Sequence, residues 1–168
     1  MTDSLESRLA ALEQRLQVVE DREAIIKLKA AYVNHNDGGW DGPTHCFPDE
    51  VAELFTEDGI WDGRPGVGYA SGREDIRRLF RDFQVMPFII HHVTNPLIEI
   101  DGDSATGHWH AIVTANLPDG TARWVFGLYK ETYARTPAGW KFKTLVFETT
   151  INSAYEEGWG TARGPSQG

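Results

Sequence analysis

Cysteine is nearly absent from this chain of 168 residues, since Cys46 is the only one. A single cysteine excludes an intramolecular disulfide framework and the small secreted domains that depend on one. No apolar run approaches the length of about 20 residues that a membrane-spanning helix needs. The first residues are polar and acidic rather than typical of a secretion signal. We therefore expect a cytoplasmic protein without a membrane partner.

Positive charge is also scarce, because 16 lysines and arginines face 25 aspartates and glutamates, a net charge of −9. Without a basic surplus to neutralise phosphates, nucleic acid is excluded as a partner. The apolar fraction of 40% is typical of a globular protein, and this length suits one domain. We expect that domain to span residues 1–155, with residues 1–20 as an N-terminal helical extension and 156–168 as a loose tail.

Apolar residues near the N-terminus alternate spacings of four and three, which is the a/d pattern of a coiled-coil seam. Charged residues flank this pattern, which covers about two and a half heptads and is too short for an isolated coiled coil. We expect a helix that packs on another subunit or across its own domain. The pattern shifts at residues 21–23, and a second helical run continues to about His35. The seam residues are Leu5, Leu9, Leu12, Leu16 and Val19.

The middle of the chain predicts short elements. Asp49 can cap a short helix that runs to Phe55, a turn at residues 57–59 follows, and Ile60 and Trp61 form a short strand. Ser71 and Glu74 match a capping box, so we predict a helix after them with an apolar stripe at Ile76, Leu79, Phe80 and Phe83.

From Phe88 onward the pattern is typical of strands separated by Gly-rich and Pro-rich turns. The predicted strands cover residues 88–100, 105–116, 121–135 and 140–151. Helices followed by a four-stranded antiparallel meander predict an α+β fold, a curved sheet wrapped around packed helices.

The end of the second helical run carries candidate chemistry. Tyr32 and Asp37 lie within about one and a half turns of each other, ahead of the helix-breaking Gly38. The partial negative charge of a helix C-terminus disfavours a carboxylate, so Asp37 needs a partner. Asn36, four residues after Tyr32, can share its face.

Four of the six histidines fall on two adjacent predicted strands, as His91, His92, His108 and His110. In a strand His91 and His92 point to opposite faces, while His108 and His110 share one. A rough register around the turn at residues 101–103 brings His92 near His110. Three interpretations remain open: metal binding, structural histidines, and general acid–base chemistry with an aspartate orienting a histidine.

Metal binding has the least support, because neither a helical His-x-x-x-His nor a cysteine pair accompanies these histidines. Nucleophilic triads and Gly-rich phosphate loops also lack their motifs. We expect neither a metal nor a cofactor.

The order of motifs resembles the SnoaL-like branch of the NTF2-like superfamily over nearly the whole chain. The resemblance rests on Tyr32-x4-Asp37-Gly-x-Trp40, on residues 54–59, on Gly72-Arg-Glu-Asp-Ile76 and on the block 91–107. Within the branch, the chain is most similar to bile acid 7α-dehydratase and scytalone dehydratase. The resemblance implies a cone in which a curved mixed sheet and helices enclose a deep apolar pocket. It also implies a homo-oligomer, a trimer ahead of a dimer.

The resemblance further implies the site residues. Asp37 occupies the position of the aspartate that pairs with the catalytic histidine, Tyr32 that of a catalytic tyrosine, and the histidine is His91 or His92, with His91 favoured. A second histidine on the next strand corresponds to His108 or His110. The position of a second pocket aspartate is occupied by Val113, so the substrate contacts must differ. A further pocket tyrosine maps to the region of Phe55 or Thr56.

These expectations define a cofactor-independent lyase, a dehydratase acting on a hydrophobic cyclic or polycyclic carbonyl compound. His91 or His92 would transfer the proton, with Asp37 and Tyr32 assisting and His110 as a relay or polar contact. Two alternatives remain: an isomerase or polyketide cyclase with the same enolisation, and a non-catalytic binding or assembly subunit. The expected pocket walls are Trp40, Trp61, Phe88 and Trp109, joined by Phe55 and His108 as substrate contacts.

Overall fold

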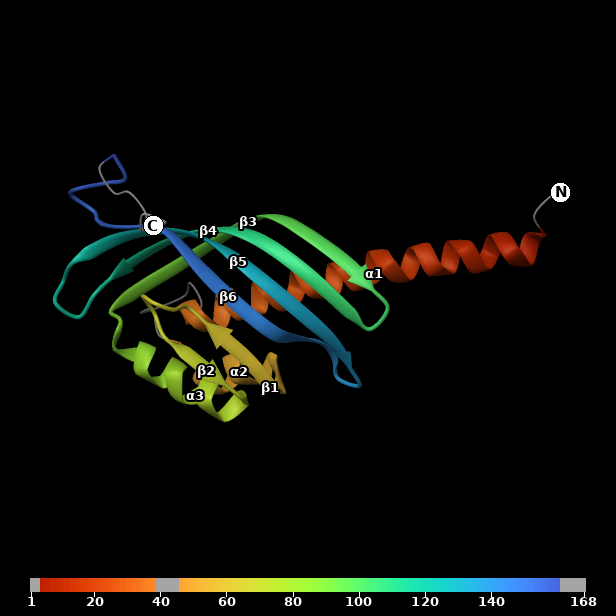
Figure 1. Cartoon of the computed structure of the whole chain (residues 1–168), viewed down its shortest axis with the longest axis horizontal. Helices are drawn as coiled ribbons and strands as arrows, with labels where there is room; N and C mark the ends of the chain where they lie inside the picture. Colours follow the sequence, from red (N-terminus) through yellow and green to blue (C-terminus); the bar gives the residue numbers. More distant parts are fainter. Residues whose placement is uncertain (1–3, 39–45, 161–168) are drawn as a thin grey trace.

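A computed structural model describes residues 4–38 and 46–160 of the chain. A long helix is followed by a small helical and β region and then by four long strands (Figure 1). The elements are α1 (Leu5–Asp37), α2 (Pro48–Glu53), β1 (Phe55–Asp62), β2 (Tyr69–Ser71), α3 (Arg73–Asp82), the 3-10 turn η1 (Phe83–Val85), β3 (Phe88–Asp101), β4 (Ser104–Asn116), β5 (Ala122–Thr136) and β6 (Gly139–Ala154).

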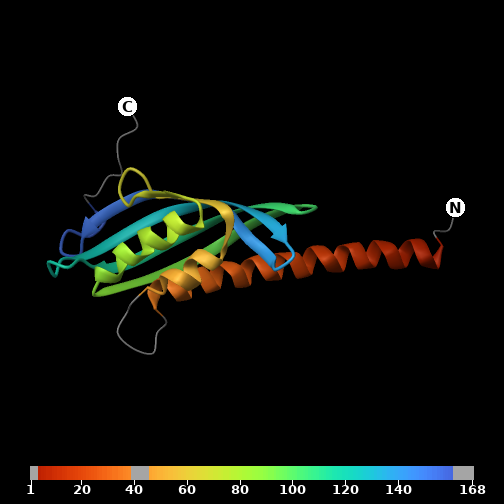
Figure 2. The same cartoon turned by 90° about the horizontal axis from the view of Figure 1, so that it is seen from below.

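The six strands form one curved mixed sheet in the order β2-β1-β6-β5-β4-β3. Strands β3 to β6 are an antiparallel meander, as predicted, and β1 pairs with β6 in parallel. The three helices lie on one side of this sheet, with α1 running beneath the meander (Figures 1 and 2). The α+β prediction is confirmed. None of the described helices is long and apolar enough to cross a membrane.

Helix α1 is a single helix of 33 residues rather than two successive runs. Ser4 caps its first turn by accepting a hydrogen bond from the Ser7 amide at 3.2 Å. At its other end Gly38 adopts the left-handed conformation (φ 74°), which a residue with a side chain rarely adopts, and its amide bonds to the Asn34 carbonyl. The helix therefore stops immediately after Asp37.

The first half of α1 projects beyond the sheet (Figures 1 and 2), and residues 4–20 are all exposed. The expected packing of this segment across its own domain is therefore wrong. Contact with the sheet begins at Asp21, whose carboxylate accepts two hydrogen bonds from Arg135, at 2.7 and 2.6 Å, and one from the indole of Trp140 at 3.0 Å. From there, buried residues recur every three or four positions, so one stripe of α1 faces the sheet.

Two local predictions are wrong. Residues 57–59 belong to strand β1 instead of forming a turn, and they lie where the parallel pairing of β1 with β6 shifts in register, between Phe55 and Ile60. Ser71 lies in β2, and Gly72 precedes α3 without a side-chain cap, so the capping box does not form. The apolar stripe of α3 is present, with Ile76 and Phe80 fully buried.

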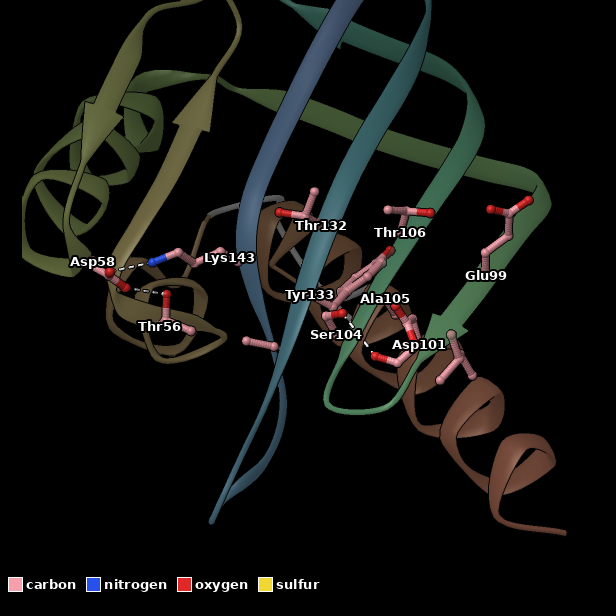
Figure 3. A pocket seen from close by; sticks show the side chains of 12 residues that line it. Thr56, Asp58, Glu99, Asp101, Ser104, Ala105, Thr106, Thr132, Tyr133 and Lys143 are labelled. Atoms are coloured by element: carbon pink, nitrogen blue, oxygen red, sulfur yellow. Dashed lines mark hydrogen bonds and ion pairs between the residues drawn. The ribbon is translucent and has the colours of Figure 1, made fainter. Parts of the chain in front are cut away.

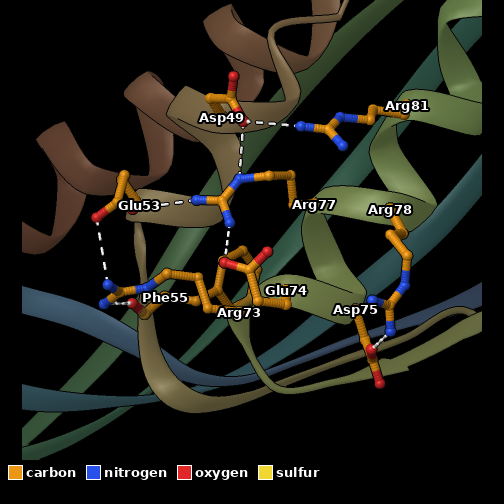
Figure 4. A network of polar contacts seen from close by, with 9 residues as sticks. All are labelled: Asp49, Glu53, Phe55, Arg73, Glu74, Asp75, Arg77, Arg78 and Arg81. Carbon is orange, nitrogen blue, oxygen red and sulfur yellow. Dashed lines mark hydrogen bonds and ion pairs between the residues drawn. The ribbon is translucent and has the colours of Figure 1, made fainter.

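Arginines join α2 to α3 on the outer side of the helical layer (Figure 4). Arg77 binds Asp49 at 2.7 Å and Glu53 at 3.2 Å, and Glu53 also contacts Arg73 at 3.3 Å. Arg73 in turn donates to the Phe55 carbonyl at 2.8 Å. This network fixes the short helices against β1, and β1 carries one wall of the cavity described below.

Candidate active site

A buried carboxylate and imidazole meet where α1 ends against β3. Asp37 Oδ1 lies 2.5 Å from His91 Nδ1, and Asp37 Oδ2 accepts the His91 backbone N–H at 3.0 Å. Asp37 is fully buried and His91 nearly so. The histidine thus supplies the partner that a carboxylate at a helix C-terminus requires. The short contact assigns the Nδ1 proton to a hydrogen bond with Asp37, leaving Nε2 as the basic nitrogen.

Asn36, which the sequence analysis did not select as a site residue, lies beside that basic nitrogen. Its Nδ2 is 3.4 Å from His91 Nε2, and its Oδ1 is buried without a hydrogen-bond partner among the described residues. An unsatisfied buried acceptor is costly unless a donor reaches it. Asn36 therefore offers a second polar group to a molecule bound next to His91.

Asn36 and His91 line a cavity of about 310 Å³ between the sheet and the helices. Its walls are mostly apolar, and Arg123 is the one arginine or lysine among the described lining residues. Arg123 Nε donates to Asn152 Oδ1 at 2.6 Å, on the neighbouring strand. The lining residues are Tyr32, Asn36, Trp61, Gly66, Val67, Phe83, Met86, Ile89, His91, Val113, Ala115, Leu117, Arg123, Val125, Tyr129, Phe147 and Asn152.

Tyr32 is held in this cavity by two neighbours. The Trp61 indole donates to the Tyr32 hydroxyl at 2.9 Å, and Tyr129 also hydrogen-bonds to it. Burial raises the pKa of Tyr32 well above its ordinary value, and the bonds from Trp61 and Tyr129 only partly oppose this. A phenol has two acceptor sites and one proton. Because neighbours occupy its acceptor sites, the neutral Tyr32 hydroxyl keeps its own proton available for donation.

A buried ion pair packs against the rings of Tyr32 and Tyr129. Lys29 Nζ lies 2.5 Å from Glu131 Oε1 and 3.3 Å from the centre of the Tyr129 ring. Burial lowers the pKa of Lys29 to about 8, against the opposing effect of Glu131. The other Glu131 oxygen accepts a hydrogen bond from the Tyr133 hydroxyl. Lys29 thereby holds the ring of Tyr129, which lines the cavity, and its sequence signal was limited to its lying three residues before Tyr32 on the buried stripe.

The other three predicted histidines lie on the opposite face of the sheet. His92, His108 and His110 are exposed, because they alternate with the buried His91 and Trp109 along β3 and β4. His110 Nδ1 lies 3.0 Å from the side-chain nitrogen Nδ2 of Asn95. None of the three is among the described residues that line this cavity with His91, so the structure separates them from the Asp37–His91 pair. Among the described residues, no group of three His, Cys, Asp or Glu side chains is placed to hold a metal ion.

Of the expected pocket walls, Trp61 lines the cavity. Phe55 and Trp109 are buried in the core instead, where Trp109 donates to the Tyr133 hydroxyl at 3.0 Å. Phe88, at the start of β3, is 36% exposed and lies outside the lining. Trp40 lies outside the described residues. The residues that replace these aromatics are mainly aliphatic, and strand alternation on β4 would have indicated Val113 and Ala115.

A second, larger cavity of about 700 Å³ lies at the other end of the sheet, near the β3–β4 turn (Figure 3). Polar side chains from β1, β3, β4, β5 and β6 line it, and Lys143 binds Asp58 across it. Its carboxylates are exposed, and no histidine lies among its described lining residues. The features needed for acid–base chemistry therefore gather in the smaller cavity.

The fold and the site define an α+β cone protein with a carboxylate–imidazole pair and a tyrosine inside an apolar cavity. The chain belongs to the SnoaL-like domain family, whose model matches residues 17–146. No curated protein matches the sequence.

Solved structures of the NTF2-like superfamily share this fold. A candidate aromatic ring hydroxylase from Novosphingobium aromaticivorans is 29% identical with a TM-score of 0.72, covering 83% of this chain and 96% of its own. A candidate scytalone dehydratase from the same species is 22% identical, with a TM-score of 0.71 over 92% of this chain and 98% of its own. A hexachlorocyclohexane dehydrochlorinase, LinA-type3, from Novosphingobium barchaimii is 20% identical, with a TM-score of 0.71 over 83% and 93%.

Proposed function

We propose that this protein is a cofactor-independent lyase that dehydrates a hydrophobic cyclic or polycyclic carbonyl compound. The observation that carries the proposal is the buried pair of Asp37 and His91, 2.5 Å apart, with His91 lining an apolar cavity. The names of two structural relatives, a candidate scytalone dehydratase and a dehydrochlorinase, both describe eliminations, which agrees with this chemistry. The aliphatic and aromatic walls suit a ring system rather than a charged metabolite.

The reaction begins with a proton transfer. His91 Nε2 removes the proton alpha to the substrate carbonyl while its Nδ1–H donates to Asp37. Asp37 holds the imidazole in the required tautomer and stabilises the imidazolium that forms. The electron pair of the broken C–H bond moves into an enolate, and the Tyr32 hydroxyl donates to the enolate oxygen.

The second step expels the leaving group. The enolate re-forms the carbonyl and a new C=C bond as the C–O bond to the β-hydroxyl breaks. That oxygen takes the proton from His91 Nε2 and departs as water, which restores the neutral histidine. Asn36 places its Nδ2 3.4 Å from Nε2 and leaves its Oδ1 without a partner among the described residues, so its amide can accept a hydrogen bond from the hydroxyl before it leaves. Atoms and charge balance without a cofactor.

The experiment uses a panel of cyclic β-hydroxy ketones in D2O with the wild-type chain and with D37N, H91Q and H92Q. We expect enone formation with loss of one water, and a fall in kcat of about 10²–10⁴-fold in D37N and H91Q. H92Q is the matched control, because His92 is adjacent but faces away from the cavity, and it should retain activity.

The alternatives give different results. Deuterium exchange alpha to the carbonyl without loss of water would identify an isomerase or cyclase. Binding without exchange or elimination would identify a binding subunit. Turnover that persists in both D37N and H91Q would overturn the acid–base mechanism itself.

A further inference from the structure

The projecting half of α1 carries an apolar surface that its own domain leaves uncovered. Its seam residues are between 54% and 81% exposed, and the segment 4–20 spans about 25 Å of helix. Packing rather than propensity stabilises most protein helices, yet no described part of its own domain packs on this segment. The seam residues are Leu5, Leu9, Leu12, Leu16 and Val19.

This seam points away from the body of the protein. Val19 and Asp21 are two positions apart, which on an α-helix is about 200° of rotation. Because Asp21 is the residue that binds Arg135 and Trp140 on the sheet, Val19 faces the opposite side. A second chain can therefore lie along the seam without colliding with the sheet of the first.

The charged residues beside the seam are separated by sign, with glutamates on one side of it and arginines on the other. In heptad notation the apolar residues fill a and d, every e position carries a glutamate, and the g positions carry arginines. The a residues are Leu9 and Leu16, the d residues Leu5, Leu12 and Val19, the e residues Glu6, Glu13 and Glu20, and the g residues Arg8 and Arg15.

This arrangement distinguishes the two ways in which identical helices can pair. In a parallel, in-register pair, each g residue meets the e residue five positions later on the partner helix, so Arg8 faces Glu13 and Arg15 faces Glu20. An antiparallel pair would instead oppose g with g and e with e, arginine against arginine and glutamate against glutamate. Only the parallel arrangement satisfies the charges.

We propose that the α1 segment of residues 4–20 pairs with the same segment of a second copy of this chain, in parallel and in register. The symmetry axis then runs along the projecting helices, and the domains of both copies lie at the same end. The a/d seam supplies the buried apolar surface, and the e and g charges set the orientation. This inference is independent of the chemistry proposed for the cavity.

Disulfide trapping of full-length chains tests the orientation. In a C46S background, which removes the buried native thiol, L5C places a cysteine at a d position. Parallel pairing puts this residue opposite itself, so L5C chains should link to each other in a glutathione redox buffer. Adding R8E and R15E should lower the linked fraction about tenfold, because repulsive pairs replace attractive ones. Adding E13R and E20R to that variant should restore it.

The control S7E/Q14E adds negative charge at f positions, away from the seam, and should leave the linked fraction unchanged. Linking of L5C chains to L16C chains in place of self-linking would show antiparallel pairing, in which d positions face a positions, and would overturn the proposal. The proposal would also be overturned if the linked fraction of L5C chains were the same in buffer as in denaturant. It would equally be overturned if the charge reversals left that fraction unchanged.

Discussion

At the scale of single residues, the site depends on which atom of each side chain holds a proton. Asp37 accepts a hydrogen bond from Nδ1 of His91. The side chains of Trp61 and Tyr129 both hydrogen-bond to the Tyr32 hydroxyl. The basic nitrogen and the phenolic hydroxyl thus both belong to side chains that line the cavity before any substrate arrives. Such preorganised groups stabilise developing charge without reorganising during the reaction.

The Y32F substitution tests the role of the phenolic proton. We expect kcat to fall about 10²-fold, because one donor to the enolate oxygen is lost, whereas substrate binding to the apolar walls persists. Y133F is the matched control: Tyr133 is also buried and accepts a tryptophan N–H, but it does not line the cavity. Steady-state kinetics and thermal unfolding of both variants separate activity from stability. Equal losses of kcat in the two variants would contradict the role given to Tyr32.

The sequence predicted part of this site for a physical reason. A carboxylate at a helix C-terminus needs a partner, which pointed to Asp37, and strand alternation separated His91 from His92 without telling which one faced inward. Whether His91 or His92 faces inward depends on which face of β3 the helices cover, and the tertiary structure decides this. The spacing of Asn36 placed it on the face of Tyr32 without indicating a role, and nothing in the local spacing of Tyr129 and Arg123 indicates a shared cavity.

At the scale of elements, α1 is joined to the sheet where its exposed part ends. The Arg135 hydrogen bonds lower the pKa of Asp21 to about 2, against the opposing effect of burial. Since the pKa of this carboxyl is lower in the folded state than its ordinary 3.8, it contributes stability above that value. The contribution is lost as the pH falls through about 2.

The D21N substitution should therefore destabilise the protein in a pH-dependent way. We expect a loss of about 1–2 kcal/mol in the free energy of unfolding at pH 7, from the weakened bonds to Arg135. The difference from wild type should shrink as the pH is lowered from 4 towards 2. Urea unfolding at several pH values measures it, with D103N as control, since Asp103 binds the same arginine but is exposed. A difference that does not depend on pH would contradict this assignment.

Elements made by local patterns were predicted, and those made by distant partners were not. The meander and the stripe of α3 follow from alternation and helical spacing. The extent of β1 does not, because residues 57–59 resemble a turn, whereas the strand is held by the pairing of Phe55 and of residues 60–62 with β6 on either side of them. The break perceived in α1 at residues 21–23 marks the place where its apolar residues change from the exposed seam to the face on the sheet.

At the scale of the whole molecule, the projecting helix should govern assembly. The L9A/L12A variant removes two exposed seam leucines without touching the cavity. We expect a lower mass in sedimentation velocity at micromolar concentration, with catalytic parameters retained, because the seam loses its apolar contacts. Q14A/V18A, which changes exposed residues outside the seam, should keep the wild-type mass. An unchanged mass in L9A/L12A would argue against assembly through α1.

The continuity of α1 has a mechanical consequence. Helix α1 is about 50 Å long, with the exposed seam near its N-terminus and Asp37 at its C-terminus. The salt bridge between Asp21 and Arg135 holds the helix to the sheet between these two ends. From Asp21 to Asp37 the lever arm is about 24 Å, so a tilt of about 2.4° displaces the carboxylate by about 1 Å. The tip and the acid–base pair are thus joined by one continuous helix that is held to the sheet at Asp21 between them.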